Sequence, residues 1–502
     1  MFEKMLYRSD MIRCLLCRDA PCSRACTKLD PAALLRSIWF DNESGAAAKV
    51  SDTLPCLFCP APCEEHCLRR GEVPIRALLT ALHRKALLGV EPCPGNEDRL
   101  RTDLCGFPLE NPFLLSSSVV ASNYDMCARA FDAGWAGVSF KTICNFEIHE
   151  ASPRYSSIAG SGQDIIGFKN IEQLSDHSVE ENMAIFRQLN RKYPHKLILA
   201  SIMGRDEREW GYLARRCEDN GADAVELNFS CPNMAESGLG SDIGQIPELV
   251  ERYTAAAKSA CSIPVLAKLT PNVASLVPAA KAAKNGGADG ISAINTIKSV
   301  VGMNLHTFVS SPAVHGLSAV GGYSGCAVKP IALRMIAELG WEKELQGLHI
   351  SGMGGIETWQ DAMEFVLLGA STLQVTTAVM QYGYRIIDDL KDGMNRYLSE
   401  KGFRSVKEAV GLGLDSLSAT TDVLERDTVI YPKFLRDRCV GCGRCVTSCM
   451  DGGHQALRLS AVRKPILDPH RCVGCHLCTL VCPTHAIVPS GRRMKPIGQH
   501  AR

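Results

Sequence analysis

The sequence predicts an α/β fold in which a (β/α)8 TIM barrel is flanked by a cysteine-rich domain at each end. Sixteen of its 24 cysteines fall into four clusters, two near each end of the 502-residue chain. Between them lie eight short apolar runs, each followed by a segment long enough for a helix. Because continuous apolar strands that alternate with helices form parallel sheets covered on both faces, eight such units predict a closed barrel.

The eight predicted strands share small or polar residues at their C-terminal ends. They are PFLLSSS (112–118), GVSFKT (137–142), LILASIMG (197–204), AVELNFSC (224–231), PVLAKLTPN (264–272), GISAINT (290–296), GLHISGMGGI (347–356) and TLQVTTAV (372–379). Barrel enzymes build their active sites at the C-terminal ends of the strands. We therefore expect a site among the polar residues there, which are Lys141, Thr142, Asn228 to Cys231, Lys268, Asn295, Thr296, Gly354, Gly355, Thr376 and Thr377.

Two runs of C-x2-C-x2-C-x3-C lie near the C-terminus. They consist of Cys439, Cys442, Cys445 and Cys449, and of Cys472, Cys475, Cys478 and Cys482. This spacing is typical of two [4Fe-4S] clusters in which the fourth cysteine of each run ligates the other cluster. On that crossed scheme Cys482 joins the first three cysteines of the first run, and Cys449 joins the first three of the second. Zinc sites or disulfides are the alternatives, although zinc motifs usually pair two-cysteine knuckles.

The N-terminal cysteines are less regularly spaced. They are Cys14, Cys17, Cys22, Cys26, Cys56, Cys59, Cys63 and Cys67. Eight thiols suit two [4Fe-4S] clusters, with zinc or a single cluster as alternatives. The segment CPAPCEEHC (59–67) resembles the small helical iron-sulfur domain of glutamate synthase small subunits and of dihydropyrimidine dehydrogenase.

That resemblance implies a ligand pairing for the N-terminal clusters. Cys14, Cys17 and Cys22 would share one cluster with Cys67, and the residues that need one further ligand would be Cys26, Cys59 and Cys63. Dihydropyrimidine dehydrogenase supplies this ligand from a glutamine, but none occurs here around residues 79–82. Cys56 is therefore the candidate fourth ligand.

Composition and charge narrow the function classes. This many cysteines, with no apolar signal segment and no hydrophobic run of about 18 residues, predict a soluble cytoplasmic protein in a reducing compartment. Lys plus Arg (55) nearly balance Asp plus Glu (54), so we expect neither a nucleic-acid nor a membrane partner. With 46% hydrophobic residues the length allows about three domains, predicted at 1–92, 93–425 and 426–502.

Two glycine-rich elements lie near the last predicted strands. GMGGI (352–356) and GGYSGCAVKP (321–330) each precede the expected start of a helix. Exposed backbone amides at such positions bind anions without side-chain charge. Because phosphate sites of these barrels lie after the last strands, the two elements predict a grip for the phosphate of flavin mononucleotide (FMN).

Several motifs together resemble the dihydroorotate dehydrogenase-like flavin barrel. They are LNFSCPN (227–233), AKLTPNV (267–273), INT (294–296), GGYSG with KPIAL (321–333) and QVTTAV (374–379). With the tandem ferredoxin-like tail, residues 100–490 resemble the bacterial catalytic subunits of the dihydropyrimidine dehydrogenase family. This resemblance implies FMN- and iron-sulfur-dependent reduction of the 5,6 double bond of uracil or thymine, or the reverse reaction.

The resemblance also implies residue roles. Cys231 would give a proton to one carbon while N5 of FMN gives a hydride to its neighbour. The substrate-binding positions would be Asn170, Glu172, Asn228, Ser230, Asn233, Asn295 and Thr296. The FMN-binding positions would be Ser117, Lys141, Thr142, Lys268, Gly325, Gly354, Gly355, Thr376 and Thr377. Amide side chains suit pyrimidines because they both donate and accept hydrogen bonds, and Lys268 would stabilise negative charge on the reduced flavin.

Other features concern substrate and partner. Dihydropyrimidine dehydrogenases usually carry histidine at the position of Asn233, whereas dihydroorotate dehydrogenases carry asparagine, so orotate or another cyclic amide is an alternative substrate.

No G-x-G-x-x-G follows a strand near the N-terminus. We therefore expect a separate FAD-containing NAD(P)H flavoprotein subunit or a ferredoxin as electron donor, in a homodimer or heteromer. A non-catalytic electron-transfer subunit is the other alternative, against which Cys231, Lys268 and the glycine loops argue.

Overall fold

The structure is a computed structural model that describes residues 11, 13–50, 55–70, 72–87, 97–159, 165–234 and 238–495. The chain divides into two compact units, Met1–Leu417 and Ser418–Arg502. The predicted boundary between residues 92 and 93 lies outside the described residues, and the three-domain division stays a prediction.

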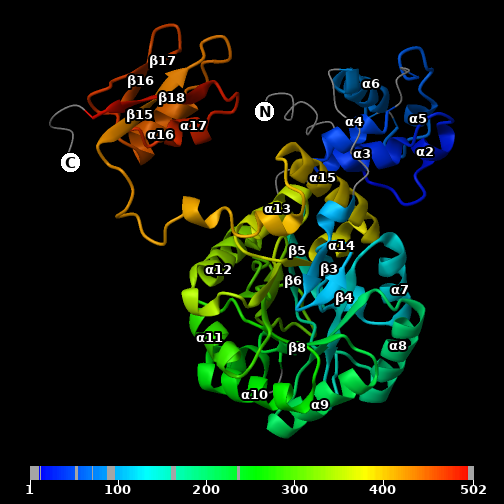
Figure 1. The fold of residues 1–502 in the computed structure, drawn as a ribbon. Helices are drawn as coiled ribbons and strands as arrows, with labels where there is room; N and C mark the ends of the chain where they lie inside the picture. Colours follow the sequence, from blue (N-terminus) through cyan, green and yellow to red (C-terminus); the bar gives the residue numbers. More distant parts are fainter. Residues whose placement is uncertain are drawn as a thin grey trace. The chain divides into compact units, whose positions relative to one another are not determined.

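Eight parallel strands close into a barrel in the first unit (Figure 1). Their order around the barrel is their order along the chain, and the last strand pairs with the first. They are β3 (Phe113–Leu115), β4 (Gly137–Ile143), β7 (Leu197–Ile202), β8 (Ala224–Asn228), β9 (Val265–Lys268), β10 (Gly290–Ala293), β13 (His349–Met353) and β14 (Thr372–Val375). Each predicted run overlaps one of these strands, so the predicted barrel is confirmed.

Helices surround the barrel in Figure 1. They are α7 (Tyr124–Ala133), α8 (Val179–Lys192), α9 (Glu207–Asp219), α10 (Pro247–Ala260), α11 (Val277–Asn285), α12 (Lys329–Trp341), α13 (Trp359–Leu367), α14 (Thr377–Tyr382) and α15 (Ile387–Glu400). Local sequence defines several of their starts: Ser178 and Glu181 form a capping box on α8, as Thr358 and Asp361 do on α13. Their apolar faces pack on the strands, where Phe186, Trp210 and Phe365 are fully buried.

The two ends of the barrel differ. A hairpin of β1 (Thr102–Leu104) and β2 (Phe107–Leu109) joins an apolar cluster with residues of the barrel strands, including Leu114, Leu199 and Leu266. At the C-terminal ends, chain inserted after β4 and β10 forms an antiparallel sheet in the order β11-β12-β6-β5. Its strands are β5 (Tyr155–Ala159), β6 (Ile165–Asn170), β11 (Ile297–Ser299) and β12 (Gly321–Ser324).

Strand β12 differs from the sequence expectation. The segment GGYSG was expected to be a glycine loop, but its first four residues form β12, which pairs with β6 and β11. Glycine is needed in this strand because a Cβ at Gly321 would lie 2.4 Å from the carbonyl oxygen of Asn170. Only Gly325, at the end of the segment, leaves the strand.

Short helices form the N-terminal part of the first unit. They are α2 (Pro21–Ala25), α3 (Pro31–Trp39), α4 (Glu43–Ala48), α5 (Pro62–Glu65) and α6 (Ile75–Leu87), and their apolar residues form a separate core. This part is tied to α15, since Arg36 Nε lies 2.7 Å from Asp389 Oδ2 and Asn42 Nδ2 donates to Asp392 Oδ2 at 2.8 Å.

The second unit contains two small antiparallel sheets and two helices. Strand β15 (Thr428–Phe434) pairs with β18 (Ile487–Met494), and β16 (Leu457–Leu459) pairs with β17 (Pro465–Leu467). Helices α16 (Arg444–Gly452) and α17 (Leu477–Leu480) carry cysteines of the two C-terminal motifs. Its small core contains two of these cysteines, Cys445 and Cys478, with Leu457 and Ile487.

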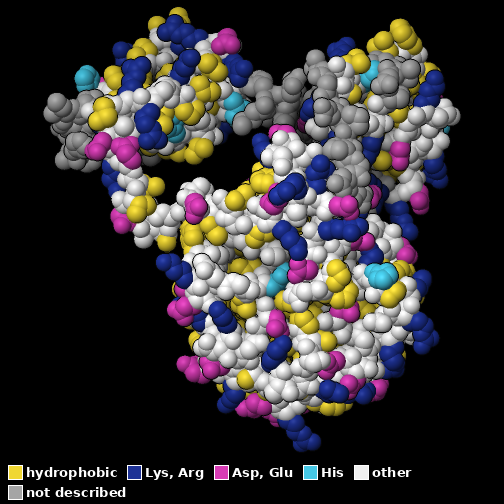
Figure 2. Space-filling view, in the orientation of Figure 1, with side chains coloured by type: hydrophobic (Ala, Val, Ile, Leu, Met, Phe, Trp, Pro, Cys, Tyr) yellow, Lys and Arg dark blue, Asp and Glu magenta, His cyan; other side chains and the backbone are white. Residues whose placement is uncertain are grey.

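Basic and acidic side chains are interspersed over the barrel face seen in Figure 2. This agrees with the near balance of 55 basic and 54 acidic residues. Among the described residues, no helix is both long enough and apolar enough to span a membrane.

Candidate active site and metal centres

A cavity opens at the C-terminal ends of the barrel strands. Its volume is about 1140 Å³, counting the part open to solvent, and cavities that hold cofactors and substrates commonly reach about 1,000 Å³. Sixteen of the seventeen predicted barrel-site residues line it: Ser117, Lys141, Thr142, Asn170, Glu172, Asn228, Cys231, Asn233, Lys268, Asn295, Thr296, Gly325, Gly354, Gly355, Thr376 and Thr377. Ser230 is the exception.

Cys231 lies on the loop that follows β8 and is 6% exposed. Its carbonyl oxygen accepts a hydrogen bond of 2.9 Å from the N–H of Ser241. The backbone before Ser241 comes so close to Cys231 that position 240 must be glycine. Its φ is +55°, and a Cβ there would lie 2.4 Å from the Cys231 carbonyl oxygen. Burial raises the pKa of the Cys231 thiol to about 11, although the backbone N–H of Asn233 opposes this. The thiol is therefore protonated at neutral pH and can act as a general acid.

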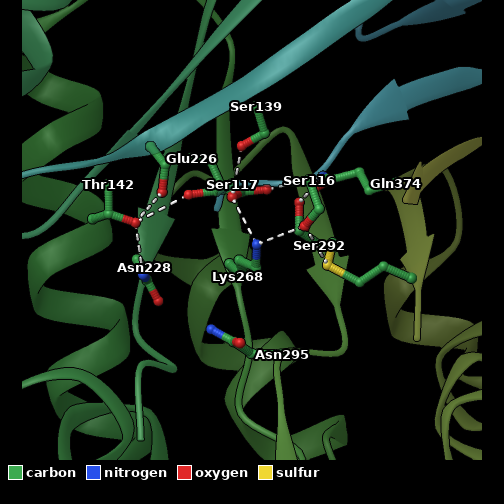
Figure 3. Close-up of polar contacts among 12 residues, drawn as sticks. Ser116, Ser117, Ser139, Thr142, Glu226, Asn228, Lys268, Ser292, Asn295 and Gln374 are labelled. Atoms are coloured by element: carbon green, nitrogen blue, oxygen red, sulfur yellow. Dashed lines mark hydrogen bonds and ion pairs between the residues drawn. The ribbon is translucent and has the colours of Figure 1, made fainter. Parts of the chain in front are cut away.

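Ser230 forms hydrogen bonds with the side-chain amides of Asn228 and Asn295, which both line the cavity. Its fully buried hydroxyl donates to Asn228 Oδ1 at 2.8 Å and accepts from Asn295 Nδ2 at 2.8 Å. The other end of Asn228 donates to Thr142 Oγ1 at 2.9 Å (Figure 3). Ser230 does not line the cavity, because its hydroxyl is held between the two asparagines, and its role in substrate binding stays a prediction.

Asn233 lines the cavity, and its amide is oriented by two neighbouring acceptors. Its Nδ2 donates to Asn170 Oδ1 at 3.0 Å and to the backbone oxygen of Glu172 at 2.7 Å. These two acceptors fix the amide, since a flipped amide would place oxygen against oxygen. Asn233 Oδ1 is buried and has no hydrogen-bond partner among the described residues. Buried polar atoms are normally satisfied, so this oxygen is an exception on a residue that lines the cavity.

The two cavity lysines are both paired with carboxylates. Lys141 Nζ lies 3.6 Å from Glu172 Oε1 and 3.9 Å from Glu150 Oε1. Lys268 Nζ lies 3.2 Å from Glu226 Oε1. Burial raises the pKa of Glu150, with Lys141 among the groups that oppose the shift. The pKa of Glu226 is lowered because Lys268 and several hydrogen bonds outweigh the opposing effect of burial.

The two glycine elements meet at the cavity. Gly355 has φ of +87°, and a Cβ there would lie 2.9 Å from the backbone oxygen of Gly325. Helix α12 begins four residues after Gly325, and α14 begins at Thr377. The two glycine segments therefore lie against each other, and each is near the start of a helix. Such an arrangement of backbone N–H groups fits a phosphate group.

Comparison with known proteins agrees with this geometry. Residues 99–398 match the dihydroorotate dehydrogenase family and residues 434–488 match the 4Fe-4S dicluster domain. The chain is 51% identical over 389 residues to the NAD-dependent dihydropyrimidine dehydrogenase subunit PreA of Escherichia coli K12, covering 77% of this chain and 94% of that protein. The chain belongs to the dihydroorotate dehydrogenase family, as a dihydropyrimidine dehydrogenase-like member.

This dihydropyrimidine dehydrogenase-like chain is also similar to one further dihydropyrimidine dehydrogenase and to a dihydroorotate dehydrogenase subunit. It is 35% identical over 351 residues to the chloroplastic dihydropyrimidine dehydrogenase (NADP(+)) of Arabidopsis thaliana, covering 68% of this chain and 82% of that protein. It is 38% identical over 316 residues to the dihydroorotate dehydrogenase B (NAD(+)) catalytic subunit of Pyrococcus abyssi, covering 63% of this chain and 99% of that protein. The predicted class, an oxidoreductase acting on CH–CH bonds with a C-terminal iron-sulfur domain, is confirmed.

The cluster cysteines lie in sets of four. Three small cavities are lined by Cys439, Cys442, Cys445 and Cys482, by Cys449, Cys472, Cys475 and Cys478, and by Cys14, Cys17, Cys22 and Cys67. Cys56 lies near the remaining N-terminal cysteines, since the pKa of its thiol is raised by burial and then by Cys26 and Cys59. Among the described residues, no three metal-ligating side chains converge on one ion position. Four thiols around a small cavity suit a cluster, and their roles as ligands stay predictions.

Sequence reasoning missed several residues of this dehydrogenase-like site, among them Gln374 and Glu226. Gln374 lines the cavity, and Glu226 lies in the barrel interior beside Lys268. Both occur inside runs that read as apolar strands, AVELN and TLQV. A charged residue within a buried strand needs a partner, so Glu226 carried a signal that could have been used.

Proposed function

We propose that the chain interconverts uracil or thymine with the corresponding 5,6-dihydropyrimidine, using FMN in the barrel cavity. The observation that carries this proposal is Cys231, a buried and protonated thiol on the wall of a cavity that also has a glycine-rich phosphate grip. Bound FMN supplies a hydride to one carbon of the substrate double bond. Cys231 gives the proton to the neighbouring carbon from its Sγ.

The charges of the cavity support a neutral substrate. Lys141 and Lys268 are both paired with carboxylates, and no arginine is among the described residues that line the cavity. The carboxylate of orotate placed beside Glu172 would meet like charge, and the cation nearest to Glu172, Lys141, is already shared between Glu172 and Glu150. The free acceptor Asn233 Oδ1 fits an N–H of a neutral pyrimidine ring. Asn233 therefore does not by itself favour orotate.

The thiol sets support electron delivery through clusters. We assign one [4Fe-4S] cluster to each of the four sets, including Cys26, Cys56, Cys59 and Cys63, for four clusters in the chain. Clusters carry single electrons, so a donor must deliver them in two steps to a two-electron reaction. The relative from Escherichia coli is named as a subunit, and we propose a separate FAD-containing NAD(P)H subunit or a ferredoxin as the donor of this chain, in a homodimer or heteromer.

The test is an anaerobic turnover assay on the full chain, with reduced viologen as a one-electron donor. Uracil, thymine and orotate are compared, with Cys231→Ala as the inactive variant and Cys144→Ala as the matched control. Cys144 is another buried cysteine, 5% exposed, that does not line the cavity. Consumption of uracil or thymine that Cys231→Ala abolishes and Cys144→Ala retains would support the proposal. Consumption of orotate alone, or of no pyrimidine by FMN-loaded protein, would refute it.

A further inference from the structure

The barrel interior beneath the cavity is unusually polar. Barrels of this type are normally filled by layers of branched apolar side chains. Here the layer next to the cavity is built from buried polar residues on six strands, namely Ser139, Glu226, Lys268, Ser292, Ser351 and Gln374. An apolar cluster lies at the opposite end of the barrel, where His349 and Thr372 are polar residues at the starts of β13 and β14.

Glu226 is the centre of this layer (Figure 3). It is fully buried and does not line the cavity. Its Oε1 accepts from Ser139 Oγ at 3.0 Å and from Lys268 Nζ at 3.2 Å, and its Oε2 accepts from Gln374 Nε2 at 2.9 Å. Lys268 does line the cavity and also donates to Ser116 Oγ at 3.3 Å. The Glu226 carboxylate therefore does not reach the cavity itself, but it is hydrogen-bonded to Lys268, which does.

The layer does not form a proton wire. Hydrogen bonds run from His349 through Thr372 and Ser351 to Gln374, and then to Glu226. The Gln374 amide nitrogen donates but does not accept, so it cannot pass a proton along this chain. Burial lowers the pKa of His349 to about 4, so its ring stays neutral near neutral pH. The effect of Glu226 on the cavity is therefore electrostatic.

The contact between Glu226 and Lys268 allows the carboxylate to compensate the charge of the lysine. Lys268 is 2% exposed, and burying an ammonium charge is costly unless a carboxylate faces it. Glu226 is the carboxylate within 4 Å of Lys268 among the described residues. Other titratable groups also line the cavity, namely Lys141, Tyr155, Glu172, Cys231, Tyr323 and Glu357, and Lys141 has its own carboxylates.

We propose that Glu226 is a positioning residue that keeps Lys268 in its charged form in both oxidation states of the flavin, and so fixes the number of protons taken up on reduction. This inference rests on the proposed flavin site. Above neutral pH the oxidised flavin takes two electrons and one proton to become the reduced anion, which meets a cation that is already present. With Glu226→Gln, Lys268 Nζ is uncharged beside the oxidised flavin and takes up a second proton with the two electrons.

The test is the midpoint potential of the bound flavin as a function of pH, titrated anaerobically with dithionite on the full chain. One extra proton per two electrons is a tenfold change in the equilibrium constant per pH unit, or about 30 mV for a two-electron couple. We expect the slope of Glu226→Gln to exceed that of the wild type by this amount. In Glu226→Gln/Lys268→Arg the slope should return to the wild-type value, because arginine does not lose its proton.

The control is Asp223→Asn, directly before β8, whose carboxylate accepts from the N–H of Ile198 at 2.8 Å and does not line the cavity. Its slope should equal that of the wild type. Equal slopes for Glu226→Gln and wild type would overturn the inference. So would a wild-type slope of two protons per two electrons, a measurement that does not depend on whether a variant folds. Absence of flavin from the wild-type protein would instead overturn the proposed function.

Discussion

The Cys231 thiol should make the two directions of the reaction respond differently to pH. Reduction of the pyrimidine uses the thiol as an acid, and oxidation of the dihydropyrimidine uses the thiolate as a base. Burial raises the pKa of this thiol to about 11, so at pH 8 roughly one molecule in a thousand carries the thiolate. Reduction should therefore be insensitive to pH up to about pH 10. Oxidation should rise about tenfold per pH unit over the same range.

Single-turnover stopped-flow kinetics, followed by flavin absorbance under anaerobic conditions, measures both directions. Removing the acid in Cys231→Ala should slow reduction by roughly 10²–10⁴-fold, while Cys144→Ala should keep the wild-type rate. Cys144 is matched in chemistry, since burial also raises its pKa to about 11. An oxidation rate that does not change with pH, or a Cys231→Ala variant as fast as the wild type, would refute the assignment of the acid.

Three further changes test other parts of the chain. Gly355→Ala should lower the flavin content measured by absorbance, because its Cβ would lie 2.9 Å from the Gly325 oxygen; unchanged content would remove this loop from the phosphate site. Cys482→Ser should abolish the electron paramagnetic resonance signal of one cluster, and an intact spectrum would contradict the crossed scheme. Asp389→Ala removes the buried partner of Arg36, 2.7 Å away, but leaves its second partner, Asp388, at 3.3 Å, and should lower the free energy of unfolding in urea by about 1–3 kcal/mol; an unchanged free energy of unfolding would contradict this role of the pair.

The barrel was predictable because its signals are local. Each strand is a short apolar run, and polar residues at the strand ends are gathered by the closure of the sheet. The added sheet over the cavity was not predicted. Its strand β5 has no fully buried position, and β12 pairs with β6, which is about 150 residues away in sequence. No local pattern indicates a pairing at that distance.

Contacts of single site residues were less predictable than the residues themselves. Ser230 stands beside Cys231 in LNFSCPN, and both looked equally suited to face the substrate. Only the structure shows the hydroxyl held between Asn228 and Asn295. Similarly, the sequence contains Asn233, but the orientation of its free oxygen depends on Asn170 and on the backbone of Glu172.

A buried ion pair such as Glu226–Lys268 is weak evidence for a role in stability. Replacing a buried ion pair by apolar residues of similar volume is often neutral or stabilising by about 1–4 kcal/mol, and apolar packing is the usual content of such a barrel. The pair lies directly beneath the cavity, and one partner, Lys268, lines it. The carboxylate also orients Gln374, 148 residues away along the chain, by accepting its amide hydrogen. The position of this charged pair, with one partner on the cavity wall, agrees with a role in the chemistry of the cavity.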